Sequence, residues 1–342
     1  MVDLSVIPLW GVIVVFIAAA AVITFAGVKL AGTAEAIADK TGLGQAIVGA
    51  VFLGISTSLS GTVLSFYSAS QGHSSLAISN AVGGIAAQTV FLAVADISYR
   101  KANLEHAASS LENLLQSALL ATLLAVPILA MAGPEVTFFN VHPASVLLVV
   151  LYILGLRVVS SSRGQPFWRA TQTRQTQNET SQSHPSNKSL KSLLLYFAIL
   201  ALLLGISGIG MAESALEIAG RTGISQTIVG GFLTSVATSL PELITVLAAV
   251  HNGALNLAVG DIIGGNSFDV LFLAGSDVFY RAGSIYHQIN SDHVVMTTMA
   301  MLMNGMLMLG LLRREEHGFA GIGFESVAVL LFYGLLIIMM IF

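Results

Sequence analysis

The chain has 342 residues, of which 55% are hydrophobic and only 9% are charged, and its formal net charge is -4. Soluble domains carry about 25% charged residues, and the mean hydropathy here is +0.84, so the composition excludes an ordinary soluble protein. The absence of cysteine excludes disulfides, thiolate metal sites and cysteine nucleophiles.

Apolar runs of about 18 residues or more, as bilayer-spanning helices require, recur along the whole chain. The first has no basic segment before it and is too long for a typical signal-peptide core, so we expect a retained helix. The fold class predicted is an all-α polytopic membrane protein with ten transmembrane helices. In chain order they are expected at residues 6–31, 43–70, 75–98, 112–132, 143–160, 190–211, 224–250, 255–279, 292–312 and 321–342.

One long polar segment separates the fifth expected helix from the sixth. Residues 161–190 are rich in Gln, Ser, Thr and Asn and poor in aliphatic residues, so they cannot bury a core and are expected to form a flexible linker. The linker divides the chain into a first five-helix unit at 1–160 and a second at 191–342.

The two units contain an internal repeat. Residues 41–100 align without a gap on 222–281 at a constant offset of 181, with 20 identities in 60 positions. Shared apolar composition does not easily place matched "T-G-x-x-Q-x-I-V-G", "T-S-L", "G-G" and "D-x-x-Y-R" in one register. Because each unit has an odd number of spans, the second enters the membrane inverted. Inverted repeats with polar, interrupted helices at matched positions are typical of secondary transporters.

Basic residues indicate the orientation. If the chain crosses ten times, 12 of the 14 Lys and Arg residues share one side, and only Arg221 and Arg281 lie opposite. The positive-inside rule makes the richer side cytoplasmic. We therefore expect an integral protein of the plasma (inner) membrane, with both termini outside and the central linker in the cytoplasm.

Three acidic residues near helix ends have ordinary structural interpretations. Asp96 and Asp277 each precede an arginine by four residues, so we expect ion pairs within one helix. Asp261 follows a glycine before an expected helix break, which favours a capping role over ligation of a cation.

The helix expected at 224–250 carries an acid beside a helix breaker. Pro241 removes a backbone amide and pushes the helix open, which a membrane protein tolerates where the freed backbone lines a cavity or is otherwise satisfied. Thr238, Ser239 and Glu242 follow one another at i, i+1 and i+4. Glu242 therefore shares a face with both hydroxyls.

The next helix repeats this arrangement. Asn266 and Asp269 lie at i and i+3, directly after the pair Gly264–Gly265, where we expect the helix to break. A lone acid in a membrane helix can serve packing, but two acids in adjacent helices, each beside a breaker, favour a functional site. Carboxylates, an amide oxygen, hydroxyls and free carbonyls form the all-oxygen ligand set that hard cations such as Ca²⁺ take.

Two motifs carry a family resemblance. "A-T-S-L-P-E-L" and "L-A-V-G-D-I-I-G-G-N-S-F-D" resemble the second alpha repeat of the calcium/cation antiporter superfamily, the sodium/calcium exchanger-like proteins. The resemblance makes 41–100 the alpha-1 region and 222–281 the alpha-2 region. It implies a mid-membrane cation site used for alternating access, with Asn266 lining it. The implied ligands are Thr238, Ser239, Glu242 and Asp269, of which Glu242 and Asp269 would hold a metal ion.

The first repeat departs from the pattern of that family. Gly61 stands opposite Glu242 and Gln88 opposite Asp269, so the alpha-1 region is degenerate and has lost its charge. Two carboxylates neutralise one divalent cation or two monovalent ones, and a third bound charge in a low dielectric is expensive. The departure therefore disfavours three-sodium exchange more than divalent binding. The neutral oxygen donors that remain in the first repeat are Thr57, Ser58 and Gln88.

These features together predict a secondary active antiporter that exchanges Ca²⁺ or a similar cation against Na⁺ or H⁺. The alternative is a cation-binding regulatory membrane protein that kept the fold but lost turnover, which the missing acids at Gly61 and Gln88 favour. The sequence holds no phosphate loop, nucleotide fingerprint or nucleophile elbow, so an ATP-driven pump or an enzyme is disfavoured. Expected partners are inorganic cations and the lipid bilayer, without nucleotide, nucleic acid or resident cofactor.

Overall fold

A computed structural model describes residues 4–41, 54–99, 102–162, 189–318 and 322–342. Helices dominate this part of the chain, as the composition predicts. Eight of the described helices are long and apolar enough to cross a membrane, and one bent pair brings the number to nine. The remaining expected span, 43–70, begins outside the described residues, so the count of ten stays a prediction.

The described helices follow the order of the predicted spans. They are α1 (Leu9–Thr41), α3 (Gly54–Thr57), α4 (Leu59–Ser70), α5 (Ser74–Ser98), α6 (Leu104–Ala107), α7 (Leu111–Ala132), α8 (Pro143–Ser161), α9 (Leu190–Thr222), α10 (Gln226–Ile228), the π-helical segment η3 (Val229–Thr234), α11 (Ser235–Thr238), α12 (Leu240–His251), α13 (Leu255–Asp269), α14 (Leu271–Phe279), α15 (Ser291–Arg313) and α16 (Phe324–Ile341). Short 3-10 turns lie at Leu4–Val6 and Ile285–Gln288.

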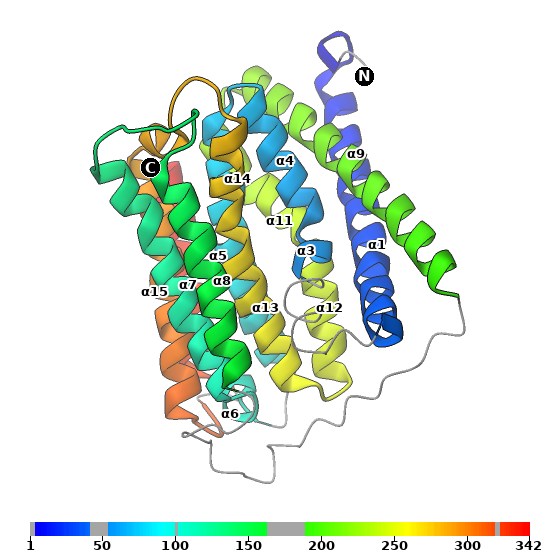
Figure 1. Cartoon of the computed structure of the whole chain (residues 1–342), viewed down its shortest axis with the longest axis vertical. Helices are drawn as coiled ribbons and strands as arrows, with labels where there is room; N and C mark the ends of the chain where they lie inside the picture. The colour runs from blue at the N-terminus through cyan, green and yellow to red at the C-terminus, as the bar shows by residue number, and fades with distance from the viewer. Residues whose placement is uncertain (1–3, 42–53, 100–101, 163–188, 319–321) are drawn as a thin grey trace.

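α1 and α9 are longer than predicted. Each has 33 residues, which at 1.5 Å per residue gives about 50 Å, more than the hydrocarbon core of about 30 Å. The two pack against each other, and in Figure 1 they form one flank of the molecule. The apolar run locates such a helix but does not mark its end, because polar residues continue the helix past the membrane.

α5 forms the centre of the molecule. In its apolar window 89% of the residues are buried, against 22% in α1, α9 and α16. It packs against α4, η3, α11, α12, α13 and α15. The outer helices therefore face lipid, while α5 and its partners can hold polar side chains away from it.

The helix expected at 224–250 is broken, as Pro241 predicts. Gln226–Thr238 and Leu240–His251 meet at an angle of 44°, with Ser239 between them. Ser58, its counterpart at an offset of 181, likewise separates α3 from α4. The first repeat therefore has a matching break although Ser60 stands where the second repeat has its proline.

The break expected at Gly264–Gly265 is wrong. α13 runs through both glycines to Asp269, and the interruption falls at Val270. A Cβ on Gly264 would lie 3.4 Å from the side chain of Gln116, and one on Gly265 would lie 3.6 Å from that of Gln88. The glycines thus leave room for neighbouring amide side chains rather than interrupting the helix.

Asp277 joins the two repeats instead of pairing with Arg281. Its Oδ1 accepts a hydrogen bond of 3.0 Å from the backbone N–H of Ile285, and its Oδ2 one of 2.7 Å from that of His142. Asp277 is fully buried, whereas Arg281 is exposed. The expected ion pair within one helix is therefore wrong, because two orphan backbone amides at helix starts offer a buried carboxylate better partners.

Asp96 makes the equivalent bonds at an offset of 181, while its expected ion-pair partner Arg100 lies outside the described residues. Its Oδ1 accepts from the N–H of Leu104 at 2.7 Å and its Oδ2 from that of Gly323 at 3.1 Å. Each aspartate thus caps a segment of its own repeat and the start of a helix of the other. Figure 1 also shows α4 and α12 leaving their breaks in opposite directions. The sequence repeat is therefore accompanied by a repeat of the same tertiary hydrogen bonds.

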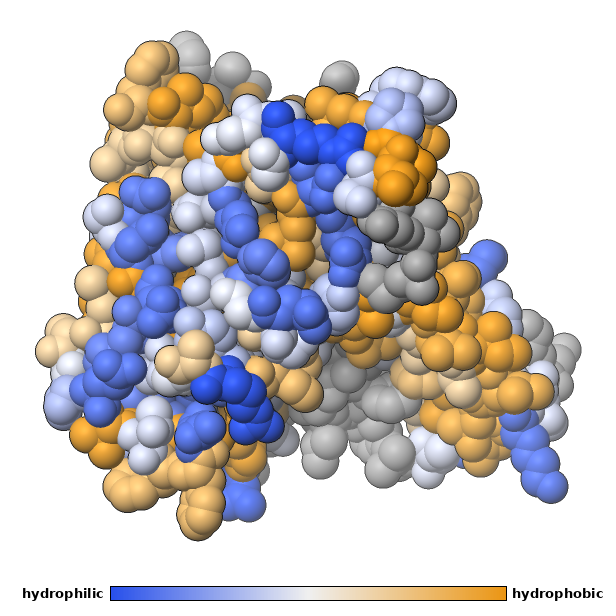
Figure 2. All heavy atoms as spheres, turned by 90° about the horizontal axis from the view of Figure 1, so that it is seen from above, coloured by the Kyte–Doolittle hydropathy of each residue, from blue (hydrophilic) through white to orange (hydrophobic). Residues whose placement is uncertain are grey.

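The start of α1 and the end of α16 lie at the same end of the molecule, and the end of α8 lies at the other (Figure 1). Figure 2 looks onto the end with the termini and shows hydrophilic residues gathered over the middle, with hydrophobic residues along much of the rim. This distribution fits a bundle whose sides contact lipid and whose ends contact water.

Candidate functional site

The two helix breaks meet at a small buried cavity. Ser58 and Ser239, the residues at the breaks, both line it. Its volume is about 10 Å³, which is room for about one water-sized particle. The cavity is lined by Ser58, Gly61, Asn80, Gly84, Gln88, Thr238, Ser239, Glu242, Asp269 and Phe272.

Six of the eight residues singled out in the sequence line this cavity, and all eight are buried. The other two, Thr57 and Asn266, lie beside it. The hydroxyl of Thr57 donates to the carbonyl of Gly54 at 3.2 Å and interacts with Glu242. The amide of Asn266 donates to Thr89 at 3.2 Å.

Glu242 enters the cavity from the first turn of α12. The break leaves orphan amides at the start of this helix, and an acidic side chain is favourable there. Its Oε1 accepts a hydrogen bond from the Ser58 hydroxyl at 3.5 Å. Its Oε2 is buried and has no hydrogen-bond partner.

Asp269 is the last residue of α13 and lines the same cavity. Its Oδ2 accepts from the Gln88 side-chain amide at 2.7 Å, and the same nitrogen donates to the Ser239 hydroxyl at 3.2 Å. Its Oδ1 is buried and has no hydrogen-bond partner. Each carboxyl group therefore has one bonded oxygen and one oxygen without a donor at hydrogen-bond distance, while the hydroxyls of Thr57 and Ser58 also interact with Glu242 and Asp269, respectively.

The electrostatics of the cavity favour a positive ligand. Its lining contains two carboxyl groups and neither lysine nor arginine. Besides the two carboxyl oxygens, Gln88 Oε1 and Asn266 Oδ1 are buried without a donor. Buried polar atoms are normally hydrogen-bonded, and unpaired buried charges are expensive. Three orphaned oxygens on residues that line the cavity, with a fourth on Asn266 three residues before Asp269 in α13, therefore point to a cation or to protons as the missing partner.

The donor set is mixed rather than purely acidic. Among the described residues no group of three or more His, Cys, Asp or Glu is placed to hold a metal ion. Two carboxylates with hydroxyl and amide oxygens suit a hard cation that is bound reversibly. They do not suit a thiolate- or imidazole-binding metal.

Asn80 and Phe272 line the cavity but had no part in the site expected from sequence. Asn80 donates to Gly61 O at 3.3 Å and to Ser65 Oγ at 3.0 Å, and accepts from Thr234 at 2.9 Å. It therefore ties α4 and η3 to α5. Phe272 belongs to the stretch "F-L-A", which both repeats share. This identity between the repeats is the sequence feature that could have pointed to Phe272.

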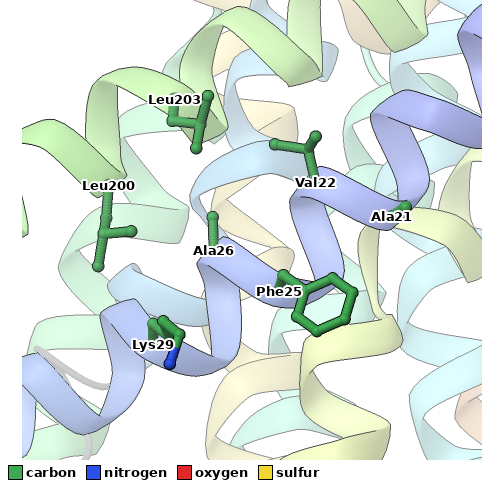
Figure 3. Close-up of a pocket in the computed structure, with 7 residues that line it drawn as sticks. All are labelled: Ala21, Val22, Phe25, Ala26, Lys29, Leu200 and Leu203. Carbon is green, nitrogen blue, oxygen red and sulfur yellow. The ribbon is translucent and has the colours of Figure 1, made fainter.

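A larger hollow lies elsewhere, between α1 and α9 on the flank of the molecule. Its volume is about 310 Å³, and Figure 3 shows its aliphatic and aromatic lining with Lys29 as the one ionisable side chain. Without an acidic or amide group it offers a cation no ligands. The small polar cavity, not the large apolar hollow, is the candidate site.

Comparison with known proteins identifies relatives of both repeats. The sequence profile described as "Sodium/calcium exchanger protein" matches residues 11–161 and again residues 192–342. These two segments cover most of the chain.

Three curated relatives match shorter stretches. The putative antiporter CaxA of Alkalimonas amylolytica is 35% identical over 117 residues, which are 34% of this chain and 36% of that protein. The inner membrane protein YrbG of Escherichia coli (strain K12) is 31% identical over 91 residues, 27% of this chain and 28% of that protein. The sodium/calcium exchanger MaX1 of Methanosarcina acetivorans is 36% identical over 69 residues, 20% of each chain. The matches thus span about a third or less of the relatives' lengths.

Solved structures show the same fold over nearly the whole chain. The sodium-calcium exchanger NCX_Mj, soaked with Na⁺ and Sr²⁺, superimposes with a TM-score of 0.59 at 20% identity, covering 96% of this chain and 99% of that one. The H⁺/Ca²⁺ exchanger CAX superimposes with a TM-score of 0.69 at 14% identity, covering 97% and 82%.

Proposed function

Because this chain belongs to the sodium/calcium exchanger protein family, we propose that it is a secondary active antiporter that exchanges Ca²⁺ or a similar cation against Na⁺ or H⁺. The observation that carries the proposal is the buried cavity in which Glu242 and Asp269 each leave one oxygen without a donor. Relatives described as an antiporter and as exchangers of Na⁺ or H⁺ against Ca²⁺ support it.

In this proposal the two carboxylates balance the charge of the cation and the neutral donors complete its shell. Ser58, Ser239 and Thr238 contribute hydroxyl oxygens from the two helix breaks. Thr57, Gln88 and Asn266 support the carboxylates or supply further oxygens. Alternating access then requires that the broken helices open the cavity to one side of the membrane at a time.

Acidic residues continue from the cavity towards the end of the molecule away from the termini. Asp261 lies within electrostatic range of Glu242, and Glu35 within range of Asp261. Asp261 lies in the middle of α13, so the expected capping role is wrong. We propose instead that Asp261 and Glu35 attract cations towards the site from the cytoplasmic side.

For the topology we propose ten spans in two inverted five-helix repeats, with the linker 161–190 in the cytoplasm. The membrane is proposed to be the inner (plasma) membrane, in line with the name of the E. coli relative. The distribution of basic residues in the sequence supports the orientation with both termini outside.

The test uses everted membrane vesicles from cells that express the chain. We expect uptake of Ca²⁺, or of another cation in a panel with Na⁺, K⁺ and Mg²⁺, when an opposing Na⁺ or H⁺ gradient is imposed. Vesicles from cells without the chain are the control. Absence of gradient-dependent flux for every cation, with folded protein in the membrane, contradicts the proposal.

The missing acids of the first repeat support a second candidate, a cation-binding regulatory protein without transport. Gly61 and Gln88 stand where symmetry with Glu242 and Asp269 would place carboxylates. A cation that raises the melting temperature of the purified protein, together with no flux in the vesicles, is the outcome that favours this candidate.

A further inference from the structure

Gln88 lies where the two repeats meet at the cavity. It stands opposite Asp269 at the repeat offset of 181, and the two side chains contact each other directly. Gln88 Nε2 lies 2.7 Å from Asp269 Oδ2 and 3.2 Å from Ser239 Oγ. A side-chain amide has two N–H donors, and both are directed at oxygen atoms of the candidate site.

This nitrogen lies against the carboxylate oxygen that a bound cation would contact. The 2.7 Å between Gln88 Nε2 and Asp269 Oδ2 is the length of a short N–H···O hydrogen bond, and a Ca²⁺ ion bound to the same oxygen would lie about 2.3–2.6 Å from it. The amide hydrogens are the positive end of a dipole directed at a carboxylate and a hydroxyl. The group therefore satisfies these oxygens without bringing a charge of its own.

Phe272 fills the second position that symmetry reserves for a ligand. A Cβ built on Gly61 would lie 3.1 Å from Phe272 Cε2, so the aromatic ring occupies the space that a longer side chain at 61 would need. The ring offers no oxygen. Together Gln88 and Phe272 replace the charged half of a symmetric site with neutral groups.

The remaining space is small. The cavity of about 10 Å³ holds about one water-sized particle, and its unbonded carboxyl oxygens are Glu242 Oε2 and Asp269 Oδ1. Two negative charges balance one divalent cation, or one monovalent cation with one proton.

We propose that the Gln88 amide nitrogen is a built-in substitute for a second cation, so that the site holds a single cation at a time between Glu242 and Asp269. The inference rests on the proposed function and deepens it. It limits the site to one bound cation, rather than several, in each half of the exchange cycle. Gln88 is thus a residue that sets stoichiometry.

The test counts bound cations on the purified, folded protein by equilibrium dialysis with radioactive Ca²⁺ and Na⁺. We expect wild type to bind one cation per chain, with Na⁺ competing against Ca²⁺ at a Hill coefficient near one. In Gln88→Glu an acceptor replaces the donor, so a second cation should bind and the Hill coefficient should rise towards two. Several cations on wild type, or an unchanged count in folded Gln88→Glu, overturns the inference.

A matched control places the same charge outside the cavity. Gln116 on α7 is buried and is not among the lining residues, so Gln116→Glu should keep the count at one. A second cation in Gln116→Glu would show that added charge alone recruits ions and would also overturn the inference.

A second variant covers the case in which Gln88→Glu does not fold. Gln88→Ala removes the amide nitrogen and leaves its space open, so Na⁺ should raise the melting temperature of this variant by more than that of wild type. An equal response in both proteins contradicts the inference.

Binding counts and flux separate this inference from the proposed function. One bound cation without counter-ion-dependent flux contradicts the antiporter and leaves the role of Gln88 standing. Coupled flux with several bound cations supports the antiporter and contradicts the role of Gln88. Wild type that binds no cation contradicts both.

Discussion

At Glu242 the two carboxyl oxygens have unequal surroundings: Ser58 donates to Oε1, while Oε2 has no partner. An amide of the same shape can keep the first contact through its oxygen but removes the charge. The shape of the Glu242 side chain and its charge can therefore be tested separately, and the substitution Glu242→Gln removes only the charge.

We expect Glu242→Gln to fold and insert normally and to lose transport. The loss of one buried charge partner is worth about 3 kcal/mol or more, which is about a 100-fold weaker affinity for a cation. Flux in vesicles and the melting temperature are measured together. Glu217→Gln, at the exposed ion pair with Arg221, is the control and should transport normally. Lowered stability with retained flux would assign Glu242 to structure.

Asp269→Asn should be nearly as damaging as Glu242→Gln, because each leaves one carboxylate to face a divalent cation. The asparagine oxygen can still accept from Gln88, so the fold should persist. The comparison is the Ca²⁺ affinity of the two variants by dialysis. Wild-type affinity in Asp269→Asn would contradict a two-carboxylate site and shift the binding to Thr57, Ser58 and Gln88.

At the scale of elements, α5 and η3 touch through glycine. A Cβ on Gly83 would lie 2.3 Å from the carbonyl oxygen of Gly231, whereas one on the adjacent Gly84 would lie 3.7 Å from the nearest atom, Ser239 Oγ. The π-helical turn is pressed against the central helix at this point. Such segments are frequently found at functional sites.

Gly83→Ala should therefore destabilise the protein, while Gly84→Ala should fold. Overpacking against a backbone atom costs about 1–3 kcal/mol, and neither backbone can move without shifting a whole helix. Melting temperature and yield of monodisperse protein are the readouts. Equal stability of the two variants would mean that α5 and η3 are not in backbone contact.

α6 carries a buried acid outside the membrane-spanning helices. Glu105 is buried, and burial first, then the charges of Asp96 and Glu325, raise the pKa of Glu105 well above its ordinary range. A raised pKa in the folded state means that the folded protein binds the proton more tightly than the unfolded chain. The stability from this group is present below the unfolded pKa of about 4.3 and is lost as the pH rises through the folded pKa.

We expect the free energy of unfolding of wild type, and with it the melting temperature, to fall as the pH is raised through this window. This one group contributes at most about 1.4 kcal/mol per pH unit to the fall in the free energy of unfolding. Glu105→Gln cannot release a proton and should show a flatter profile. Glu112→Gln, half-buried at the start of α7, should keep the wild-type slope. The same slope in Glu105→Gln would contradict the role of this carboxyl group.

The elements show what sequence could and could not predict. The constant offset of 181 and the run of apolar residues are local patterns, so the duplication, the bend beside Pro241 and the residues around the cavity were accessible. The Gln88–Asp269 bond and the ring of Phe272 over Gly61 depend on packing between segments far apart in the chain. No local pattern encodes such contacts, and the break assigned to Gly264–Gly265 failed for the same reason.

At the scale of the whole molecule, the two repeats hold each other through the matched aspartates Asp96 and Asp277. The broken helices of both repeats contribute to the polar cavity. Neither repeat forms the site alone, since Gln88 and Ser58 come from the first, and Glu242 and Asp269 from the second.

The orientation of the whole molecule can be tested cleanly because the chain has no cysteine. Phe139, between α7 and α8, is fully exposed, and Ser161 is exposed at the other end of α8. On intact cells a membrane-impermeant maleimide should label Phe139→Cys and should label Ser161→Cys only after permeabilisation. The reverse pattern would invert the topology.

The most direct test of the antiporter is trans-stimulation in proteoliposomes that contain only the purified chain. The liposomes are loaded with radioactive Ca²⁺, and its release is followed into medium with or without Na⁺ and at two external pH values. We expect release only when an external counter-ion is present, in wild type and not in Glu242→Gln. Release that is independent of every external ion, or equal in the two proteins, would contradict coupled exchange at this site.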